Sequence, residues 1–210
     1  MIPAKADPET QAAYLQQVLE PKLAEAQAGT RAVFFLDAAH FVLAPFLGFL
    51  WCVARIFIPA PSGRQRFNVL GALNAITHDL VTVTNETYIT AETVCALLQQ
   101  LAALHLGVPI TVFLDNARYQ HCALVQTTAA HLQIELCFLP AYSPNLNLIE
   151  RLWKFVKKQC LYSHYYPDFV TFKAAIETCL NETALKHRTA LDSLLTLRFQ
   201  TFEKAQSMTV

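Results

Sequence analysis

The stretch VFLDNARYQHC, residues 112–122, runs three apolar side chains directly into the carboxylate of Asp115. An unpaired ionised carboxylate is costly to bury, so an acid at the end of an apolar strand needs a partner or a cation. Asp also commonly begins a turn or caps a following helix. The stretch alone favours that structural role, so the choice depends on what the rest of the chain places beside Asp115.

A second carboxylate follows an apolar strand in the same way, because RAVFFLD (31–37) ends in Asp37 just as ITVFLD (110–115) ends in Asp115. Two strands of one sheet can place their ends side by side, and two close carboxylates repel unless one is protonated or a cation lies between them. Hard oxygen ligands favour Mg²⁺ or Mn²⁺. The other four Asp residues occupy positions typical of helix caps, turns or polar helix faces: Asp7, Asp79, Asp168 and Asp192.

The order of apolar patterns predicts an α/β fold. Strands are predicted at 31–37, 49–58, 66–77, 110–115 and 134–140, with VTVTNETYI (81–89) as an extension or short edge. Helices are predicted at 8–28, 90–106, 118–131, 148–161, 168–186 and 189–204, with Asp7 capping the first and Pro21 kinking or splitting it. Successive strands followed by alternating helices and strands predict a mixed sheet flanked by helices.

Composition excludes several classes of protein. The chain has 210 residues, 54% of them hydrophobic and 15% charged, which suits one domain with a sizeable core and some peripheral helices. Its formal net charge is zero, so DNA contact would have to come from local basic patches or from another segment. Six cysteines without a C-x-x-C pair argue against a zinc ribbon and favour reduced thiols in a cytosolic protein.

The segment 41–60 is apolar and nearly long enough to span a bilayer. Arg55 lies within it, and Pro45 and Gly48 interrupt it. We therefore interpret it as two buried strands joined by a turn, and expect no membrane partner.

A third carboxylate, Glu150, lies in LPAYSPNLNLIERLWKFVKK (139–158). Asn147 could cap the helix there, and Glu150, three residues later, would complete a pair similar to a capping box. The helix dipole also favours an ionised carboxylate in the first turn, so capping and metal binding are compatible roles. Thirty-four residues lie between Asp115 and Glu150.

In its motifs, their order and this spacing, the chain resembles the catalytic domain of DDE transposases, of the bacterial insertion-sequence type related to mariner elements. The matching segments are FFLDAAHF (34–41), PSGRQRFNVLGAL (61–73), VFLDNARYQH (112–121) and LPAYSPNLNLIERLWKFVKK (139–158). The resemblance implies a ribonuclease H-like fold in which Asp37, Asp115 and Glu150 bind two ions, Mg²⁺ or Mn²⁺. It also implies cleavage at element ends and joining of the freed 3′-hydroxyl to target DNA. The expected divisions are a linker-like helical arm (1–30), the catalytic domain (31–186) and a C-terminal helical extension (187–210).

Several other polar residues are candidates for DNA contact: Arg64, Arg66, Asn116, Arg118, His121, Arg151, Lys154, Lys157 and Lys158. The basic residues on the Glu150 helix fit either a solvated face or phosphate contact near the site. His40 and His121 fit either structural roles or the orientation of a ligand. Trp153 has the helical spacing of a core residue rather than of a platform for stacking bases.

Such transposases usually carry helix-turn-helix domains that read the element ends, whereas this chain begins with the linker-like arm. The resemblance therefore leads us to expect a separate or upstream helix-turn-helix domain, a possible homodimer, and a location on the bacterial nucleoid in the cytoplasm. Two other functions are compatible with the sequence. One is a structure-specific nuclease of the same fold, and the other is an inactive remnant that binds DNA or a partner transposase.

Overall fold

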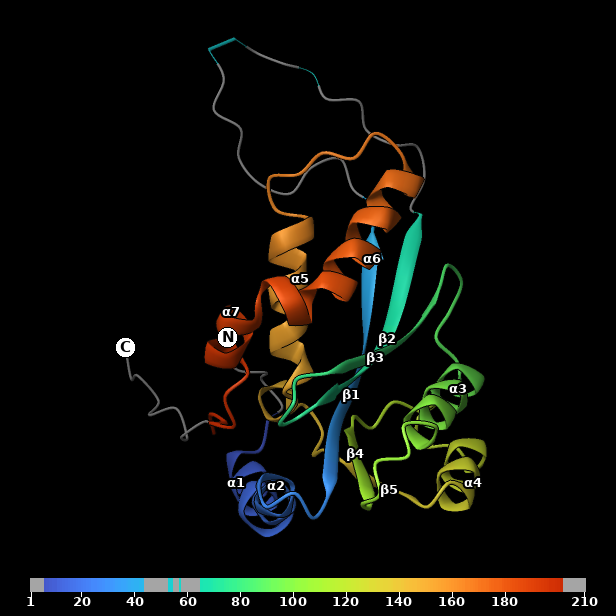
Figure 1. Cartoon of the computed structure of the whole chain (residues 1–210), viewed down its shortest axis with the longest axis vertical. Helices are drawn as coiled ribbons and strands as arrows, with labels where there is room; N and C mark the ends of the chain where they lie inside the picture. The colour runs from blue at the N-terminus through green and yellow to red at the C-terminus, as the bar shows by residue number, and fades with distance from the viewer. Residues whose placement is uncertain (1–5, 44–52, 55–56, 58–64, 202–210) are drawn as a thin grey trace, which may run out of the picture.

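The computed structural model describes residues 6–43, 53–54, 57 and 65–201. These residues form a five-stranded mixed sheet with the strand order β3-β2-β1-β4-β5 (Figure 1). The strands are β1 (Ala32–Val42), β2 (Arg66–Asn74), β3 (Leu80–Asn85), β4 (Ile110–Leu114) and β5 (Ile134–Phe138). The first three pair antiparallel, whereas β4 lies parallel to β1 and β5 parallel to β4. The predicted mixed sheet is confirmed.

Two strand predictions differ from the structure. The predicted strand at 49–58 lies mostly outside the described residues, and the described ones, Val53, Ala54 and Phe57, belong to no strand. The extension or short edge suggested for 81–89 is present as β3, a six-residue edge strand that pairs with β2. β1 also continues to Val42 instead of ending at Asp37, because β2 pairs with it along nearly its whole length.

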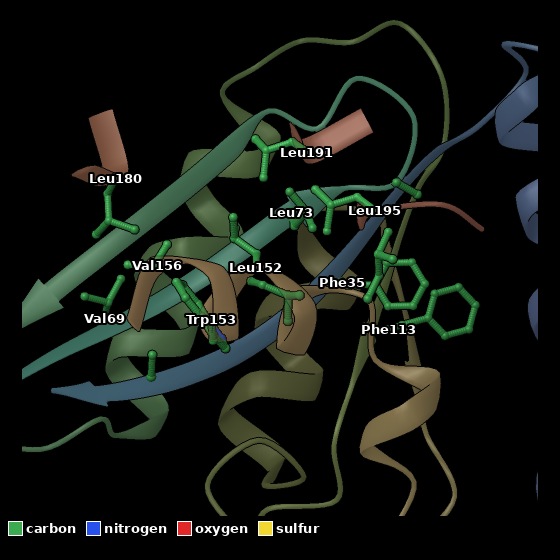
Figure 2. Close-up of a cluster of buried hydrophobic side chains, with 14 of the residues drawn as sticks. Phe35, Val69, Leu73, Phe113, Leu152, Trp153, Val156, Leu180, Leu191 and Leu195 are labelled. Atoms are coloured by element: carbon green, nitrogen blue, oxygen red, sulfur yellow. The ribbon is translucent and has the colours of Figure 1, made fainter. Parts of the chain in front are cut away.

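Helices cover both faces of the sheet, as expected (Figure 1). α3 (Ala91–Ala102) and α4 (Ala123–His131) pack on one face, where Phe34 and Leu36 of β1 contribute to the core. α5 (Ile149–Cys160), α6 (Phe169–Lys186) and α7 (Arg188–Leu194) lie on the other face. Because neighbouring side chains of a strand point to opposite faces, Val33 and Phe35 pack against this second group of helices. Figure 2 shows Phe35 in this core.

Most helices lie inside their predicted ranges. Thr90 caps α3 in a reciprocal pair with Thr93. α4 begins five residues later than predicted, after a turn at 117–122, and α7 ends at Leu194. Within the described part of the chain, none of the helices has the length and hydrophobicity needed to cross a membrane.

The N-terminal arm packs on the sheet domain. It consists of α1 (Pro8–Tyr14), a π-helical turn η1 (Leu15–Leu19) and α2 (Glu20–Gln27), and Asp7 caps α1 as predicted. The wider π turn ends two residues before Pro21, which has no N–H to continue an α-helical ladder. Leu19 and Leu23 are buried in the core, and Lys22 Nζ pairs with Glu135 Oε1 of β5 at 2.6 Å.

Candidate active site

The pairing of β1 with β4 places Asp37 and Asp115 at the same level. Phe35 and Phe113 form the last residue pair between these parallel strands, and each Asp lies two residues farther along. The period of two also places both Asp side chains on the face of Phe35 and Phe113, where α5 packs. Asp37 lies within β1, and Asp115 directly follows β4.

Asp115 has the turn-forming role that its sequence also allowed. Its Oδ1 accepts a hydrogen bond from the Ala117 backbone N–H at 3.0 Å. The adjacent Asn116 donates through Nδ2 to the carbonyl oxygen of Leu139 at 2.6 Å, which ties the end of β4 to the segment after β5. The carboxylate is therefore anchored at the strand end while it remains exposed to solvent.

The predicted capping box at Asn147 and Glu150 is wrong. The N-cap residue of α5 is Leu148, and no side chain of the described residues caps this helix. Asn147 instead donates through Nδ2 to the carbonyl oxygen of Leu36, at 3.2 Å. Asn147 is buried, so its amide needs a partner within the protein, and the carbonyl group just before Asp37 provides one. The bond holds the start of α5, and with it Glu150, against β1.

All three carboxylates line one cavity of about 330 Å³. The segment between β5 and α5 forms another part of the wall, which contains Tyr142 and Ser143. Sequence reasoning missed these two wall residues. Tyr142 has a φ of 58°, in the left-handed region, so its conformation depends on the surrounding loop. The only signal in the sequence was the spacing of Pro140 and Pro144, which marks an irregular segment.

The pKa of the Asp37 carboxyl group is clearly shifted by its surroundings. Burial raises the pKa of this carboxyl to about 7, and repulsion from Glu150 and then Asp115 adds to the effect. The Ala38 backbone N–H and the Trp153 indole act in the opposite direction. A carboxylate with this environment gains most from a bound cation, because the cation replaces repulsion by attraction.

The three carboxylates suit a divalent cation in their chemistry, since Mg²⁺ and Mn²⁺ prefer hard oxygen donors. They are not a closed cage: among the described residues, no three Asp, Glu, His or Cys side chains are close enough to enclose a metal ion. Oxygens from a nucleic acid phosphate and from water would have to complete any coordination shell.

The candidate DNA-contacting residues fall into two groups. Arg66, Arg118, Lys154 and Lys158 are exposed, Lys157 is half-buried, and Arg64 lies outside the described residues. The others have partners within the protein. Arg151 donates to the carbonyl oxygens of Leu194, Thr196 and Arg198. The ring centroids of His121 and Phe138 lie 4.2 Å apart. His40, which is a candidate for orienting a ligand rather than for DNA contact, has its Nδ1 2.7 Å from Asn68 Oδ1.

Solved transposase structures share this fold. The chain aligns with the Mos1 strand transfer complex at a TM-score of 0.59 and 14% identity, over 93% of this chain and 61% of the other. It aligns with the Mos1 mariner paired end complex with Mn at a TM-score of 0.58 and 12% identity, over 86% and 57%. The chain thus spans about three fifths of these transposase chains, and the fold is ribonuclease H-like. None of the curated proteins compared with the chain matches it in sequence.

A family model described as DDE superfamily endonuclease matches residues 55–173, more than half of the chain. The match contains Asp115 and Glu150, and the sheet places Asp37 beside Asp115. Because this match covers more than half of the chain, the chain belongs to the DDE superfamily of endonucleases.

Proposed function

We propose that this chain is the catalytic domain of a DNA transposase in which Asp37, Asp115 and Glu150 hold two divalent ions, Mg²⁺ or Mn²⁺. The observation that carries the proposal is the meeting of three carboxylates from β1, β4 and α5 around one cavity, in a chain of the DDE family. When bound, the ions would activate the attacking water or 3′-hydroxyl and stabilise the leaving oxygen.

The protein's own part in the reaction is positioning. Asp115 is anchored by the Ala117 N–H, and Glu150 by the tie from Asn147 to the backbone before Asp37. Because these anchors are backbone groups, one in β1 and one in the turn after β4, the carboxylates need little reorganisation when a phosphate enters the cavity.

A basic stripe on α5 offers a path for the DNA backbone. Lys154 follows Glu150 by one helical turn, and Lys157 and Lys158 follow by two, so these residues lie on roughly one side of the helix. At 1.5 Å per residue, the stripe reaches about 12 Å from the carboxylate. Phosphate groups on this path would hold a strand in register with the cavity.

The choice of DNA ends belongs to other parts of the system. We propose that a helix-turn-helix domain, separate or upstream, reads the element ends, and that two copies of the chain work together on a pair of ends. The solved Mos1 neighbours are paired-end and strand transfer complexes, which supports DNA as the partner of this fold.

The test is cleavage and joining with a pre-cut element end and a supercoiled plasmid. We expect nicking that needs Mg²⁺ or Mn²⁺, and joined products that carry the element end. Asp115→Asn serves as the inactive reference. Metal-dependent nicking without joined products would favour a structure-specific nuclease, and no nicking by the parent protein would contradict the proposal.

A further inference from the structure

Trp153 lies at the contact between α5 and the sheet. Figure 2 shows its side chain among the buried residues between α5 and the strands β1 and β2. A Cβ atom built on Gly71 of β2 would lie 2.8 Å from both Cη2 and Cζ2 of this indole, which is too close for a real side chain. The glycine therefore creates the space that the indole occupies.

Gly71 is also the cross-strand partner of Asp37. Paired residues of adjacent strands point to the same face, so the space left by the missing side chain of Gly71 lies beside the Asp37 carboxylate. The large ring of Trp153 thus approaches β1 at the position of the first proposed metal ligand.

The indole N–H of Trp153 is a buried hydrogen-bond donor whose acceptor is not evident in the described part of the chain. Trp153 is buried, and its Nε1 has no hydrogen-bond partner of ordinary geometry among the described residues. A buried indole N–H normally finds an acceptor, since leaving the donor unpaired is costly. The indole is close enough to Asp37 to favour its ionised form, although the contact falls short of a full hydrogen bond.

We propose that Trp153 is a positioning residue whose indole N–H holds the Asp37 carboxylate ready for metal binding, in space that Gly71 provides. Contacts in a metal-free site are often long and shorten when the ligand binds. The N–H would bond one carboxylate oxygen and leave the other for the ion, as groups behind a metal ligand commonly do. The inference rests on the proposed metal site.

The sharpest test replaces the indole by its benzothiophene isostere, β-(3-benzothienyl)alanine at position 153, which keeps the shape and removes the N–H. Mn²⁺ affinity is measured by the electron paramagnetic resonance signal of the free ion, without DNA. We expect binding weaker by about tenfold or more. Val156→Ala is the matched control, because Val156 is buried on the same helix and has no polar side-chain atom.

The isostere separates the inference from simple packing. Equal Mn²⁺ affinity in the isostere and the parent would overturn it, as would an equal loss in Val156→Ala. The proposed metal site itself fails in a different way. It fails if the parent binds Mn²⁺ no better than Asp115→Asn does.

A second measurement uses Gly71→Ala. The added methyl group must displace the indole, so we expect weaker Mn²⁺ binding in this variant too. In the isostere background the same substitution should add little further loss, because the N–H that it displaces is already gone. If the fold-losses of Mn²⁺ affinity in the two single variants multiply in the double variant, Gly71 and Trp153 act independently. That result would contradict the proposed role of Trp153.

Discussion

At the scale of single residues, Glu150 is the most informative position because its side chain faces the cavity without capping α5. We expect Glu150→Gln to abolish metal-dependent nicking, since a neutral amide is a poor substitute for a carboxylate on a hard dication. Thermal unfolding should show stability within roughly 1 kcal/mol of the parent, as for a substitution that breaks no cap.

Glu92→Gln is the matched control for this variant, because Glu92 also lies in the first turn of a helix, α3, on the opposite face of the sheet. It should nick DNA as the parent does. If Glu150→Gln also retains full nicking activity, the third proposed ligand is not Glu150.

Asp37 should make the metal-free protein less stable as pH rises. Its pKa in the folded protein is raised from 3.8 to about 7, mainly by burial, so the folded state holds a proton that the unfolded state has lost. Stability is therefore greatest below pH 4 for this group and falls as pH increases toward 7. The full shift corresponds to at most about 4 kcal/mol, and partial exposure of the carboxylate reduces it.

The measurement is urea unfolding with a chelator at pH 5 and pH 8, for the parent and for Asp37→Asn. The asparagine variant should lose less stability between the two pH values, because it has no charge to develop. An identical loss in the two proteins would show that Asp37 titrates normally.

At the scale of elements, the arm provides the first test. Leu19 of η1 is fully buried in the core, so Leu19→Ala should lower the free energy of unfolding by about 2–5 kcal/mol. The adjacent Glu20 is exposed, and Glu20→Ala should change stability by roughly 0.5 kcal/mol or less. Denaturant unfolding of both variants gives the comparison. Equal stabilities would mean that the arm does not pack on the domain in solution.

The basic residues of α5 should divide into two functions. Lys154→Ala should weaken DNA binding and reduce its salt dependence by about one phosphate contact, because Lys154 is exposed on the face of Glu150. Arg151→Ala should act on stability instead, since it frees three backbone carbonyls between Leu194 and Arg198. Salt titrations of DNA affinity and thermal unfolding separate the two effects. A larger loss of DNA affinity in Arg151→Ala than in Lys154→Ala would contradict this division.

The limits of sequence reasoning follow from the same elements. The apolar strands and the helix cap at Asp7 were predictable, because each depends on local patterns. The extension of β1 past Asp37 depends on β2, which is distant in the chain, so no local signal marked it. Asn147 has the spacing of a helix cap, but its side-chain amide donates a hydrogen bond to the Leu36 carbonyl of β1 instead. This is a tertiary contact, which local sequence does not mark.

At the scale of the whole molecule, charge decides how the chain meets DNA. Its net charge is zero, and the basic stripe on α5 is short. We expect the chain alone to bind duplex DNA weakly, without preference for element ends, and with affinity that falls steeply with salt. Binding isotherms on an end sequence and on a scrambled duplex test this. Protection confined to the terminal repeats by this chain alone would falsify it.

The central position of β1 has a consequence for synthesis on the ribosome. β2, the partner of its first edge, emerges soon after it and is followed by β3, whereas β4, which covers its other edge, begins only at Ile110. Until then the nascent chain carries a strand with an uncovered row of backbone donors and acceptors beside Val33 and Phe35. Truncated chains that end before β4 should therefore aggregate rather than remain monomeric.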